Sequence, residues 1–527
     1  MPITFREVKN YREKVIRSRR RKRLALVFSI LVVAVLLPSL YLLRQERPYI
    51  ADLPFIKPSP TQIPVKTIKH YFVPVVGFKD PRNTVALEEL KASQLVTISE
   101  NVDIFPDGYQ ADVVSLDVFI NQLVEAKIGI LRVDQITANL KTLSIDGINI
   151  WDKKIDLDAY PLTFVEKIPG ESGSIVDLDA SQLHNIFVGG EIIPARAVDR
   201  LGLNVHHDYT YLYDNVRQMI EGADLAIAQL ENPLMGNPTP CTGCTVFVGD
   251  EQNAKGLSEV GFDFLAASGN HMGDGGQDAL KRTVELLTVN NIQFTGIGKG
   301  VDEQLKPAIK EINGKKIGMI SADDVAYFYW SEDPAVYGVN SFSNTSNGNL
   351  TIDKEKVAKI KQIKETNDID YLIVYESWGV EYTNKANAHQ VELAHMFIDN
   401  GADLVVASHP HWVQNIEFYQ GKPIIYALGN FIFDQTHTVP TRQSIVLDLS
   451  YYRGELKSID IIPLQTCGYH QTTINLTAKY LNGELTAEQL STIAEKDGCI
   501  YWQPRQLDLN SAEHKQIMDR IFEHTNL

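Results

Sequence analysis

The chain contains one segment that does not suit the surface of a water-soluble domain. Residues Leu24 to Leu43 read LALVFSILVVAVLLPSLYLL and carry no charge. Twenty apolar residues in a helix span about 30 Å, the thickness of the hydrocarbon core of a bilayer. The alternative is a cleaved signal peptide, which has an apolar run of only about 7–15 residues and a small-x-small cleavage site. This segment is longer and lacks such a site, so we predict an uncleaved transmembrane helix at 24–43.

The charge of the chain is distributed unevenly about this segment. The formal net charge is −16, yet residues 1–23 hold ten Lys/Arg and two Glu, a net +8. The remaining 504 residues therefore carry −24. The positive flank predicts that residues 1–23 form a basic cytoplasmic tail and that everything after Arg44 is extracytoplasmic, as in a single-pass protein of the cell membrane. The acidic body excludes a nucleic acid as partner, because it would repel the phosphates.

Four cysteines, Cys241, Cys244, Cys467 and Cys499, lie beyond the membrane segment. An exported domain can keep disulfides, and four cysteines allow three pairings. We predict the pairs Cys241–Cys244 and Cys467–Cys499, with four free or variably paired thiols as the alternative. The Cys-Thr-Gly-Cys spacing alone is weak support for zinc, because the second pair of cysteines lacks it.

The residues that follow the membrane segment divide into a linker and a small domain. Five prolines between 44 and 66 predict a stiff, extended linker. From 67 to 165 the pattern predicts a small α/β region without a cluster of catalytic residue types. Its expected elements are a strand at 70–78, a helix at 113–126 and a strand with a turn at 143–150, followed by a linker at 169–177.

From residue 185 to about 450, short apolar strands alternate with amphipathic helices, a pattern that predicts an α/β core with buried strands. The Arg453-Gly454-Glu455 sequence between two strand-like segments predicts a hairpin. Two helices then close the chain within 466–527, the first with a capping box from Thr486 to Gln489 and the second beginning near Asn510. The predicted strands are 186–188, 225–230, 262–267, 292–295, 317–322, 371–376, 404–408 and 423–428, with helices at 278–289 and 387–399.

Polar side chains recur directly after six of these strands, where ligands gather in α/β folds. Carboxylate, amide and imidazole groups are the ligands that Mn, Zn or Fe accepts, and such a metal polarises a phosphoryl or carbonyl oxygen. Each residue also has a structural alternative as a helix cap, a turn former or an ion-pair partner. The residues are Glu191, Arg196, Glu231, Asn270, His271, Asp274, Glu381, His409, His411 and Asn430.

Six ordered motifs in this region resemble the capsule-synthesis protein family called CapA, which is linked to making or anchoring poly-γ-glutamate. The resemblance covers about 183–465 and implies an α/β sandwich of two β-sheets with helices outside (α-β-β-α), similar to calcineurin-like metallophosphoesterases. Residues 67–165 also look like the degenerate solute-binding-like segment that precedes this domain in some members. The motifs are Leu230-Glu231-Asn232-Pro233, Asn270 to Gly276 (NHMGDGG), Trp378 to Tyr382 (WGVEY), Gly401 to His411 (GADLVVASHPH), Gly421-Lys422-Pro423 and Tyr426 to Asp434 (YALGNFIFD).

The resemblance implies roles for individual residues. Its metal ligands correspond to Glu191, Glu231, Asn270, His409 and His411, its acid–base residues to His271, Asp274 and Glu381, and its substrate contacts to Arg196, Trp378 and Asn430.

Three positions depart from the family pattern. Glu191 stands where the family has Asp, Ser377 where it has His, and Ala407-Ser408 where it has Gly-His. Because a hydroxyl is a poor ligand for a transition metal, the resemblance implies one divalent metal (Mn, Zn or Fe) at a site altered at Glu191 and Ser377. Glu376 is adjacent to Ser377, but strand alternation directs it to the opposite face.

Three functions remain open from the sequence. The first is a membrane-anchored extracytoplasmic protein that supports synthesis, export or attachment of an anionic surface polymer of the poly-γ-glutamate type, with membrane synthase subunits as partners. The second is a metal-dependent phosphoesterase or amide hydrolase of the cell envelope. The third is a catalytically silent binding module with the same fold. If the protein is an enzyme, the resemblance implies a metallophosphoesterase-like hydrolase.

Overall fold

The computed structural model describes residues 65–525 except 125–126, 202–205, 237–244, 347–348, 436 and most of 467–501. These residues belong to the second of two units into which the chain divides, Pro64–Leu527. The predicted transmembrane helix at 24–43 and all four cysteines lie outside the described residues. Within the described part of the chain, no helix combines the length and apolar character that a membrane crossing requires.

The core domain is built on an eight-stranded mixed sheet. Its order is β13-β12-β11-β10-β25-β26-β27, and β24 pairs with β10. β10 to β13 run parallel, whereas β25 joins β10 in antiparallel register. The strands are β10 (Leu183–Ile192), β11 (Leu225–Leu230), β12 (Phe264–Ala266), β13 (Gln293–Thr295), β24 (Asn430–Ile432), β25 (Gln443–Tyr452), β26 (Glu455–Thr466) and β27 (Pro504–Gln506).

A second sheet of six strands has the order β15-β16-β20-β21-β23-β22, with β16, β20, β21 and β23 parallel. Two further strand pairs, β14 with β17 and β18 with β19, lie outside both sheets. The bounds are β14 (Ile297–Lys299), β15 (Ala308–Ile312), β16 (Lys315–Asp323), β17 (Tyr337–Val339), β18 (Ser343–Ser346), β19 (Asn349–Ile352), β20 (Tyr371–Ser377), β21 (Leu404–Ser408), β22 (Ile416–Tyr419) and β23 (Lys422–Ile425).

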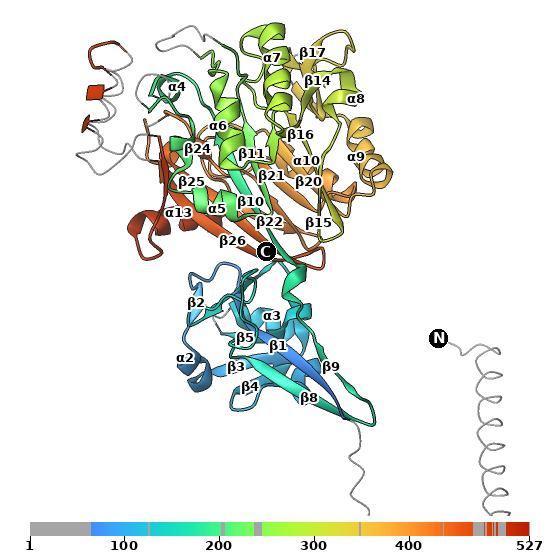
Figure 1. Ribbon diagram of the computed structural model, residues 1–527. Helices are drawn as coiled ribbons and strands as arrows, with labels where there is room; N and C mark the ends of the chain where they lie inside the picture. The colour runs from blue at the N-terminus through green and yellow to red at the C-terminus, as the bar shows by residue number, and fades with distance from the viewer. Residues whose placement is uncertain are drawn as a thin grey trace, which may run out of the picture. The chain divides into compact units, whose positions relative to one another are not determined.

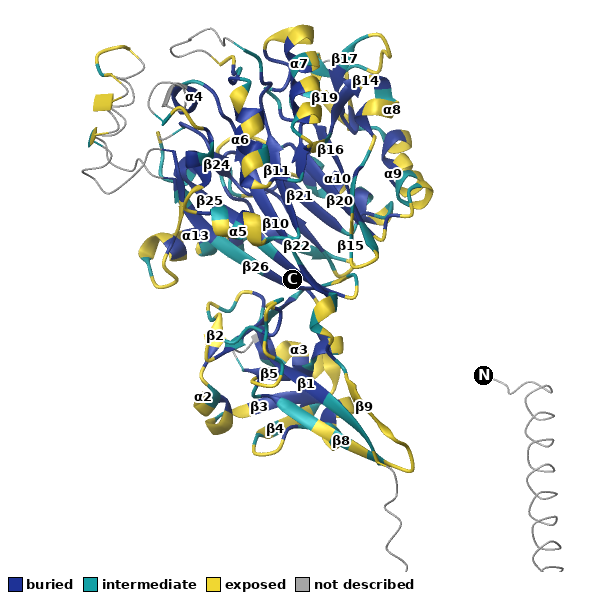
Figure 2. Ribbon diagram, in the orientation of Figure 1, coloured by how far each residue is buried: buried dark blue, intermediate teal, exposed yellow. Residues whose placement is uncertain are grey.

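The two sheets pack face to face, and helices cover the outer face of each (Figure 1). Residues on alternate positions of a strand enter different cores, as the pleat requires. On β10, Val188 packs between the sheets while Phe187 packs beneath helices. Figure 2 shows most strands of this domain buried and the outer faces of α7 and α9 exposed. The helices are α4 (Ala197–Leu201), α5 (Arg217–Gly222), α6 (Gln252–Val260), α7 (Gly276–Val289), α8 (Gly300–Gln304), α9 (Lys354–Thr366), α10 (Ala388–Asp399) and α13 (Ala512–Glu523).

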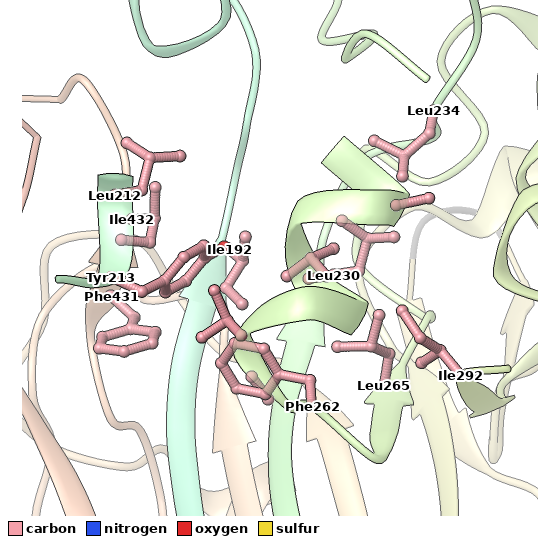
Figure 3. Close-up of a cluster of buried hydrophobic side chains, with 14 of the residues drawn as sticks. Ile192, Leu212, Tyr213, Leu230, Leu234, Phe262, Leu265, Ile292, Phe431 and Ile432 are labelled. Carbon is pink, nitrogen blue, oxygen red and sulfur yellow. The ribbon is translucent and has the colours of Figure 1, made fainter. Parts of the chain in front are cut away.

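Three separate apolar clusters define these layers. The helix side of the eight-stranded sheet packs on α5, α6 and α7, and Figure 3 shows part of this cluster, including Ile192, Leu230 and Leu265. The cluster between the sheets includes Ile227 of β11 and Ile373 of β20. The other face of the six-stranded sheet packs on α9 and α10. The α/β class and the two-sheet arrangement with outer helices expected from the sequence are therefore confirmed.

The small N-terminal domain forms a mixed sheet around the 13-residue strand β1. Its order is β4-β3-β5-β1-β6, and β8 and β9 also pair with β1. The short strands β2 and β7 form a separate pair. The elements are β1 (Val65–Gly77), β2 (Thr84–Val85), α2 (Leu87–Ala92), β3 (Gln94–Ile98), β4 (Gln110–Val114), α3 (Leu116–Val124), β5 (Gly129–Arg132), β6 (Leu140–Thr142), β7 (Ser144–Ile145), β8 (Thr163–Pro169) and β9 (Gly173–Val176).

Three expectations outside the core domain are corrected. Val113 belongs to β4 rather than to a helix, and the packed face of α3 is Phe119 and Leu123, since Leu116 and Ile120 are exposed. The segment expected as a linker at 169–177 contains β9, which pairs with β1. The C-terminal extension is not purely helical, because β27 adds a strand to the eight-stranded sheet. The capping box from Thr486 to Gln489 is present through both of its hydrogen bonds.

Candidate metal centre

Three acidic and imidazole side chains meet at the carboxyl ends of strands from both sheets. Glu191 lies near the end of β10, Glu231 follows the neighbouring strand β11, and His411 follows β21 of the other sheet. One ligand atom of each lies within 4.8 Å of the others, and all three residues are buried. Ile192 and Leu230, the neighbours of the two glutamates, point into the helix-side cluster (Figure 3), so that cluster fixes the ends of both strands.

Glu191 is held by the segment that follows β21. Its carboxylate accepts hydrogen bonds from the amide N–H of His409 and from Nδ1 of His411, the latter at 2.7 Å. The same Nδ1 lies 2.8 Å from Oδ1 of Asn430. Burial alone would raise the pKa of Glu191 and lower that of His411. The opposite charge of each partner reverses both pKa directions, so the carboxylate and the imidazolium stabilise one another.

Glu231 has no such partner. Both of its carboxylate oxygens are buried and accept no hydrogen bond from the described residues. Burial, followed by the negative charges of Glu191 and Asp323, raises the pKa of Glu231 well above its usual value. A buried carboxylate without a partner is costly, and the usual compensations are protonation, an ion pair or a metal ion.

Two further predicted ligands also have atoms without a partner. Nδ1 of His409 and Oδ1 of Asn270 are buried without a hydrogen bond. Burial and the neighbouring His411 lower the pKa of His409 to about 3, so its ring is a neutral nitrogen ligand at neutral pH. Carboxylate, amide oxygen and neutral imidazole form a donor set that suits a divalent transition metal. The residues therefore fit a metal held by Glu191, Glu231 and His411, whose ring must be neutral to bind it, and the predicted ligand roles of His409 and Asn270 stay predictions.

The backbone of the site is closely packed and locally strained. A Cβ at Gly190 would lie 2.3 Å from the carbonyl oxygen of Gly429, so only glycine lets β10 and the segment before β24 approach this closely. His409 and His411 have φ of 90° and 58°, in a region that non-glycine residues rarely adopt. Such strain persists where the surroundings enforce it, as at binding and catalytic sites.

A histidine–aspartate pair lies beside these ligands. Nδ1 of His271 is 2.8 Å from Oδ2 of Asp274. The carboxylate of Asp274 is fixed by the amide of Phe247 at 2.7 Å and the hydroxyl of Tyr329 at 2.7 Å. Because Nδ1 is engaged, Nε2 of His271 is the nitrogen left to give or take a proton. The structure thus brings the two predicted acid–base residues together.

Asp323 is a site residue that the sequence analysis did not single out. It ends β16, its Oδ2 accepts hydrogen bonds from the Ala326 amide at 2.8 Å and from Nε1 of Trp330 at 3.1 Å, and its Oδ1 is buried without a partner. Burial raises its pKa to about 7. It pairs in register with Ser377, where the family has a histidine, so a carboxylate lies beside the altered position. The sequence could have indicated Asp323, because it directly follows the predicted strand at 317–322, as the other site residues follow theirs.

Four other predicted residues have different surroundings. Trp378 is a correction: it is fully buried against Phe397 and donates its indole N–H to a backbone carbonyl, so it packs the core and does not face a ligand. Asn430 bonds His411 and the carbonyl of Thr441, so it positions His411, and its predicted substrate contact stays a prediction. Arg196 pairs with Asp434 and lies over the ring of Phe247, and Glu381 is exposed near the site, so their substrate and catalytic roles stay predictions.

These groups together define what the site can do chemically. A divalent metal held by the buried carboxylates and imidazoles would supply Lewis-acid polarisation of a phosphoryl or carbonyl oxygen. His271, oriented by Asp274, provides a proton donor or acceptor beside it. Asn430 and the His409 amide hold Glu191 and His411 in place.

The core domain matches a known family. Residues 185–435 match the sequence profile of the family described as "Bacterial capsule synthesis protein PGA_cap". The "Capsule biosynthesis protein CapA" of Bacillus anthracis is 26% identical over 282 residues, which are 52% of this chain and 66% of that protein. The "PGA biosynthesis protein CapA" of Bacillus subtilis (strain 168) is 28% identical over 279 residues, 52% of this chain and 70% of that protein. The aligned part thus spans about two thirds of each relative.

Among solved structures, a 5'-nucleotidase precursor from Thermus thermophilus is 11% identical and covers 60% of this chain and 60% of its own, with a TM-score of 0.32. A similarity at this TM-score supports no conclusion about function.

Proposed function

Because residues 185–435 match the profile of the family described as "Bacterial capsule synthesis protein PGA_cap", we propose that this chain supports the synthesis, export or attachment of an anionic surface polymer of the poly-γ-glutamate type. The family match carries the proposal, and the names of the two Bacillus relatives agree with it. The matched segment contains every member of the candidate metal centre, so the site lies in the part of the chain that the family profile covers.

We further propose that the protein is anchored in the cell membrane by residues 24–43, with the tail in the cytoplasm and the body outside. The uncharged segment behind a +8 tail supports this arrangement. An extracytoplasmic body would meet a polymer as it leaves the membrane, and membrane synthase subunits would be its partners.

A second candidate function is a metal-dependent phosphoesterase or amide hydrolase of the cell envelope. The observation that favours it is Glu231, whose two oxygens are buried without a hydrogen-bond partner. One of its oxygens lies within 4.8 Å of a ligand atom on Glu191 and of one on His411. A carboxylate in this position is poorly stabilised unless a cation compensates it. A silent binding module would not need this arrangement together with an oriented His271–Asp274 pair.

Metal content tests the site directly. The full chain, purified in detergent and reconstituted with Mn, Zn or Fe, should bind one equivalent or more. Glu231→Gln should lower the bound metal at least about tenfold, because it removes one charged ligand while preserving shape. The matched control is Glu376→Gln, because Glu376 is also fully buried and both of its oxygens lack a hydrogen-bond partner. The residues on the same face of β20 as Glu376 pack against the outer helices, so this variant should not change the metal content. Equal metal loss in both variants would reject the assignment of Glu231.

The cellular role needs a separate measurement. In cells whose own gene for this protein is deleted, the wild-type chain should restore surface polymer, and His411→Ala should not. If Glu231→Gln loses metal but restores the polymer fully, the chain supports capsule synthesis without its metal centre. Release of carboxylate or amine from poly-γ-glutamate, or of nitrophenol from bis(p-nitrophenyl) phosphate, identifies a hydrolase. Absence of both with metal bound rejects that second function for these substrates.

A further inference from the structure

A large cavity lies away from the candidate metal centre, between the small domain and the C-terminal part of the core domain. Its volume is about 810 Å³, within the roughly 300–1,000 Å³ of small-molecule sites, which often form where domains meet. Strand β6 and the segment that follows β1 line one side, and β26 and α13 line the other. None of its lining residues belongs to the metal centre.

The walls of the cavity are fixed to one another by hydrogen bonds. Nζ of Lys79 donates to the carbonyl oxygens of Phe522 at 3.2 Å and Thr525 at 2.8 Å, which ties the small domain to the C-terminal end of α13. The hydroxyls of Thr142 on β6 and Ser458 on β26 lie 3.1 Å apart and are buried. The cavity is therefore a built feature of the fold.

Two opposite charges face this cavity without meeting. Nζ of Lys141 donates only to the carbonyl oxygen of Asp80, at 2.8 Å, and forms no ion pair with Asp460 among the described residues. The side chain of Asp460 likewise has no hydrogen-bond partner among the described residues. It lies opposite Asp448 on β25, and two carboxylates in this cross-strand position repel one another. Burial lowers the pKa of Lys141 to about 8 and, with the charge of Asp448, raises that of Asp460 to about 6, so the attraction between Lys141 and Asp460 offsets only part of the cost of burying each charge.

The remaining lining combines apolar side chains and amides with further charged or titratable residues, which are Lys79, Asp448, His514, Lys515 and Asp519. Ile459, Leu507 and Met518 supply apolar surface, and Asn83 and Gln506 supply amide groups that can donate to and accept from a peptide backbone. A single amino acid would leave much of this volume empty. The lining thus suits a ligand with an apolar body, amide bonds and two charged ends.

We propose that this cavity binds a short peptide with free ends, its ammonium group at Asp460 and its carboxylate at Lys141. The separated pair then gains the two partners that the fold does not supply. This inference goes beyond the capsule role and does not depend on the metal centre, so either one can fail alone.

Calorimetric titration of the full chain in detergent tests the proposal with trialanine as the probe. Trialanine should bind at one site, and N-acetyl-trialanine amide, in which both ends are blocked, should bind at least about tenfold more weakly because two charge-assisted bonds are lost. Equal affinity for both peptides, or no saturable binding of trialanine, would overturn the proposal. This comparison uses the wild-type chain and does not depend on the folding of any variant.

Two variants then assign the ends. Asp460→Asn should weaken trialanine at least about tenfold yet bind N-acetyl-trialanine, which lacks the ammonium group, as the wild type does. Lys141→Met should weaken trialanine similarly yet bind trialanine amide, which lacks the carboxylate, as the wild type does. Lys515→Met is the control, because the amine of Lys515 already pairs with Asp519 at the cavity rim. This variant should bind trialanine with the affinity of the wild type. If each variant weakens all peptides alike, the two residues act only through the fold and the assignment is wrong.

Discussion

Three buried acids in this protein show how the surroundings of a carboxyl group decide its use. Glu191 is paired with His411 and stays ionised, whereas Glu231 and Glu376 are buried without a donor. Burial is the main cause that raises the pKa of both unpaired groups. The second cause is a nearby negative charge, that of Glu191 at Glu231 and that of Asp324 at Glu376. Only Glu231 lies beside nitrogen and oxygen ligands, so only there does a metal offer the missing charge.

The raised pKa of Asp460 makes stability depend on pH. Its ordinary pKa is about 3.9, and burial raises the folded value to about 6. The folded state therefore holds this proton more tightly, and the wild type should lose stability as pH rises from about 4 to about 6, by up to about 3 kcal/mol for one group. Asp460→Asn lacks this loss, so its melting temperature relative to the wild type should rise between pH 4 and pH 7.

Thermal unfolding of the peptide-free chain across this range checks the prediction. Asp519→Asn is the control for removing a charge near the same cavity, because its side chain is largely exposed. If the melting temperatures of Asp460→Asn and the wild type differ by the same amount at all pH values, the predicted pH dependence is contradicted.

At the same scale, the sequence predicted the polar residues of the site but not all of their surroundings. Strand ends were sufficient to select Glu191, Glu231 and His411, because parallel strands bring their carboxyl ends to one edge. Asp323 was not predicted because it stands in none of the six motifs, although it directly follows the predicted strand at 317–322. Trp378 was wrongly assigned because whether the side chain after a strand faces a ligand or the core depends on packing that a motif does not contain.

At the scale of single elements, α10 depends on its first turn. Asn387 accepts a hydrogen bond from the Gln390 amide at 3.0 Å, and Gln390 accepts one from the Asn387 amide at 2.9 Å, a complete capping box. Leu393 and Phe397 of this helix pack on the six-stranded sheet. The cap therefore stabilises one outer layer of the core domain.

Asn387→Ala should cost about 1 kcal/mol of stability, because it leaves helix N–H groups unsatisfied. Urea unfolding followed by circular dichroism measures the change. Asn387→Ser, which keeps a capping oxygen, should recover most of it. If the alanine and serine variants unfold at the same urea concentration, the cap does not contribute as described.

Elements of the core domain were largely predictable, and those of the small domain were less so. β11 and β21 have the predicted bounds because each is a short apolar run that both faces bury. The helix predicted at 113–126 is present as α3, but it begins at Leu116, and its packed face differs from the predicted one because Phe119 and Leu123 are buried whereas Leu116 is exposed. β9 was predicted as a linker because it has only four residues and begins with Gly173-Ser174 in a Gly- and Ser-containing segment, so Ile175 and Val176 were too short an apolar run to indicate a strand.

At the scale of the whole molecule, the unequal charge blocks predict how the protein fractionates. The full chain should stay with membranes after an alkaline wash, and the chain without residues 1–43 should be released. The reason is that about 20 apolar residues hold a protein in a bilayer far more firmly than surface charge does. Replacing Val33 and Leu36 with lysine should have the same effect as the deletion.

Orientation is measured separately, by adding protease to intact cells that lack an outer barrier. The body should be digested while a tag placed before residue 24 survives. Protection of the body would mean that the basic tail does not face the cytoplasm as we propose.

The two-sheet origin of the metal centre has a consequence for the timing of its assembly. The contact between Glu191 and His411 joins residues 220 positions apart in the chain, and Asn430 lies further on still. Contacts of such long range form late in folding. A growing chain that has been synthesised only through β10 and β11 contains the two acids of the site, Glu191 and Glu231, but not the imidazole of His411. Metal uptake would therefore report that synthesis has passed residue 430 and that both sheets have docked.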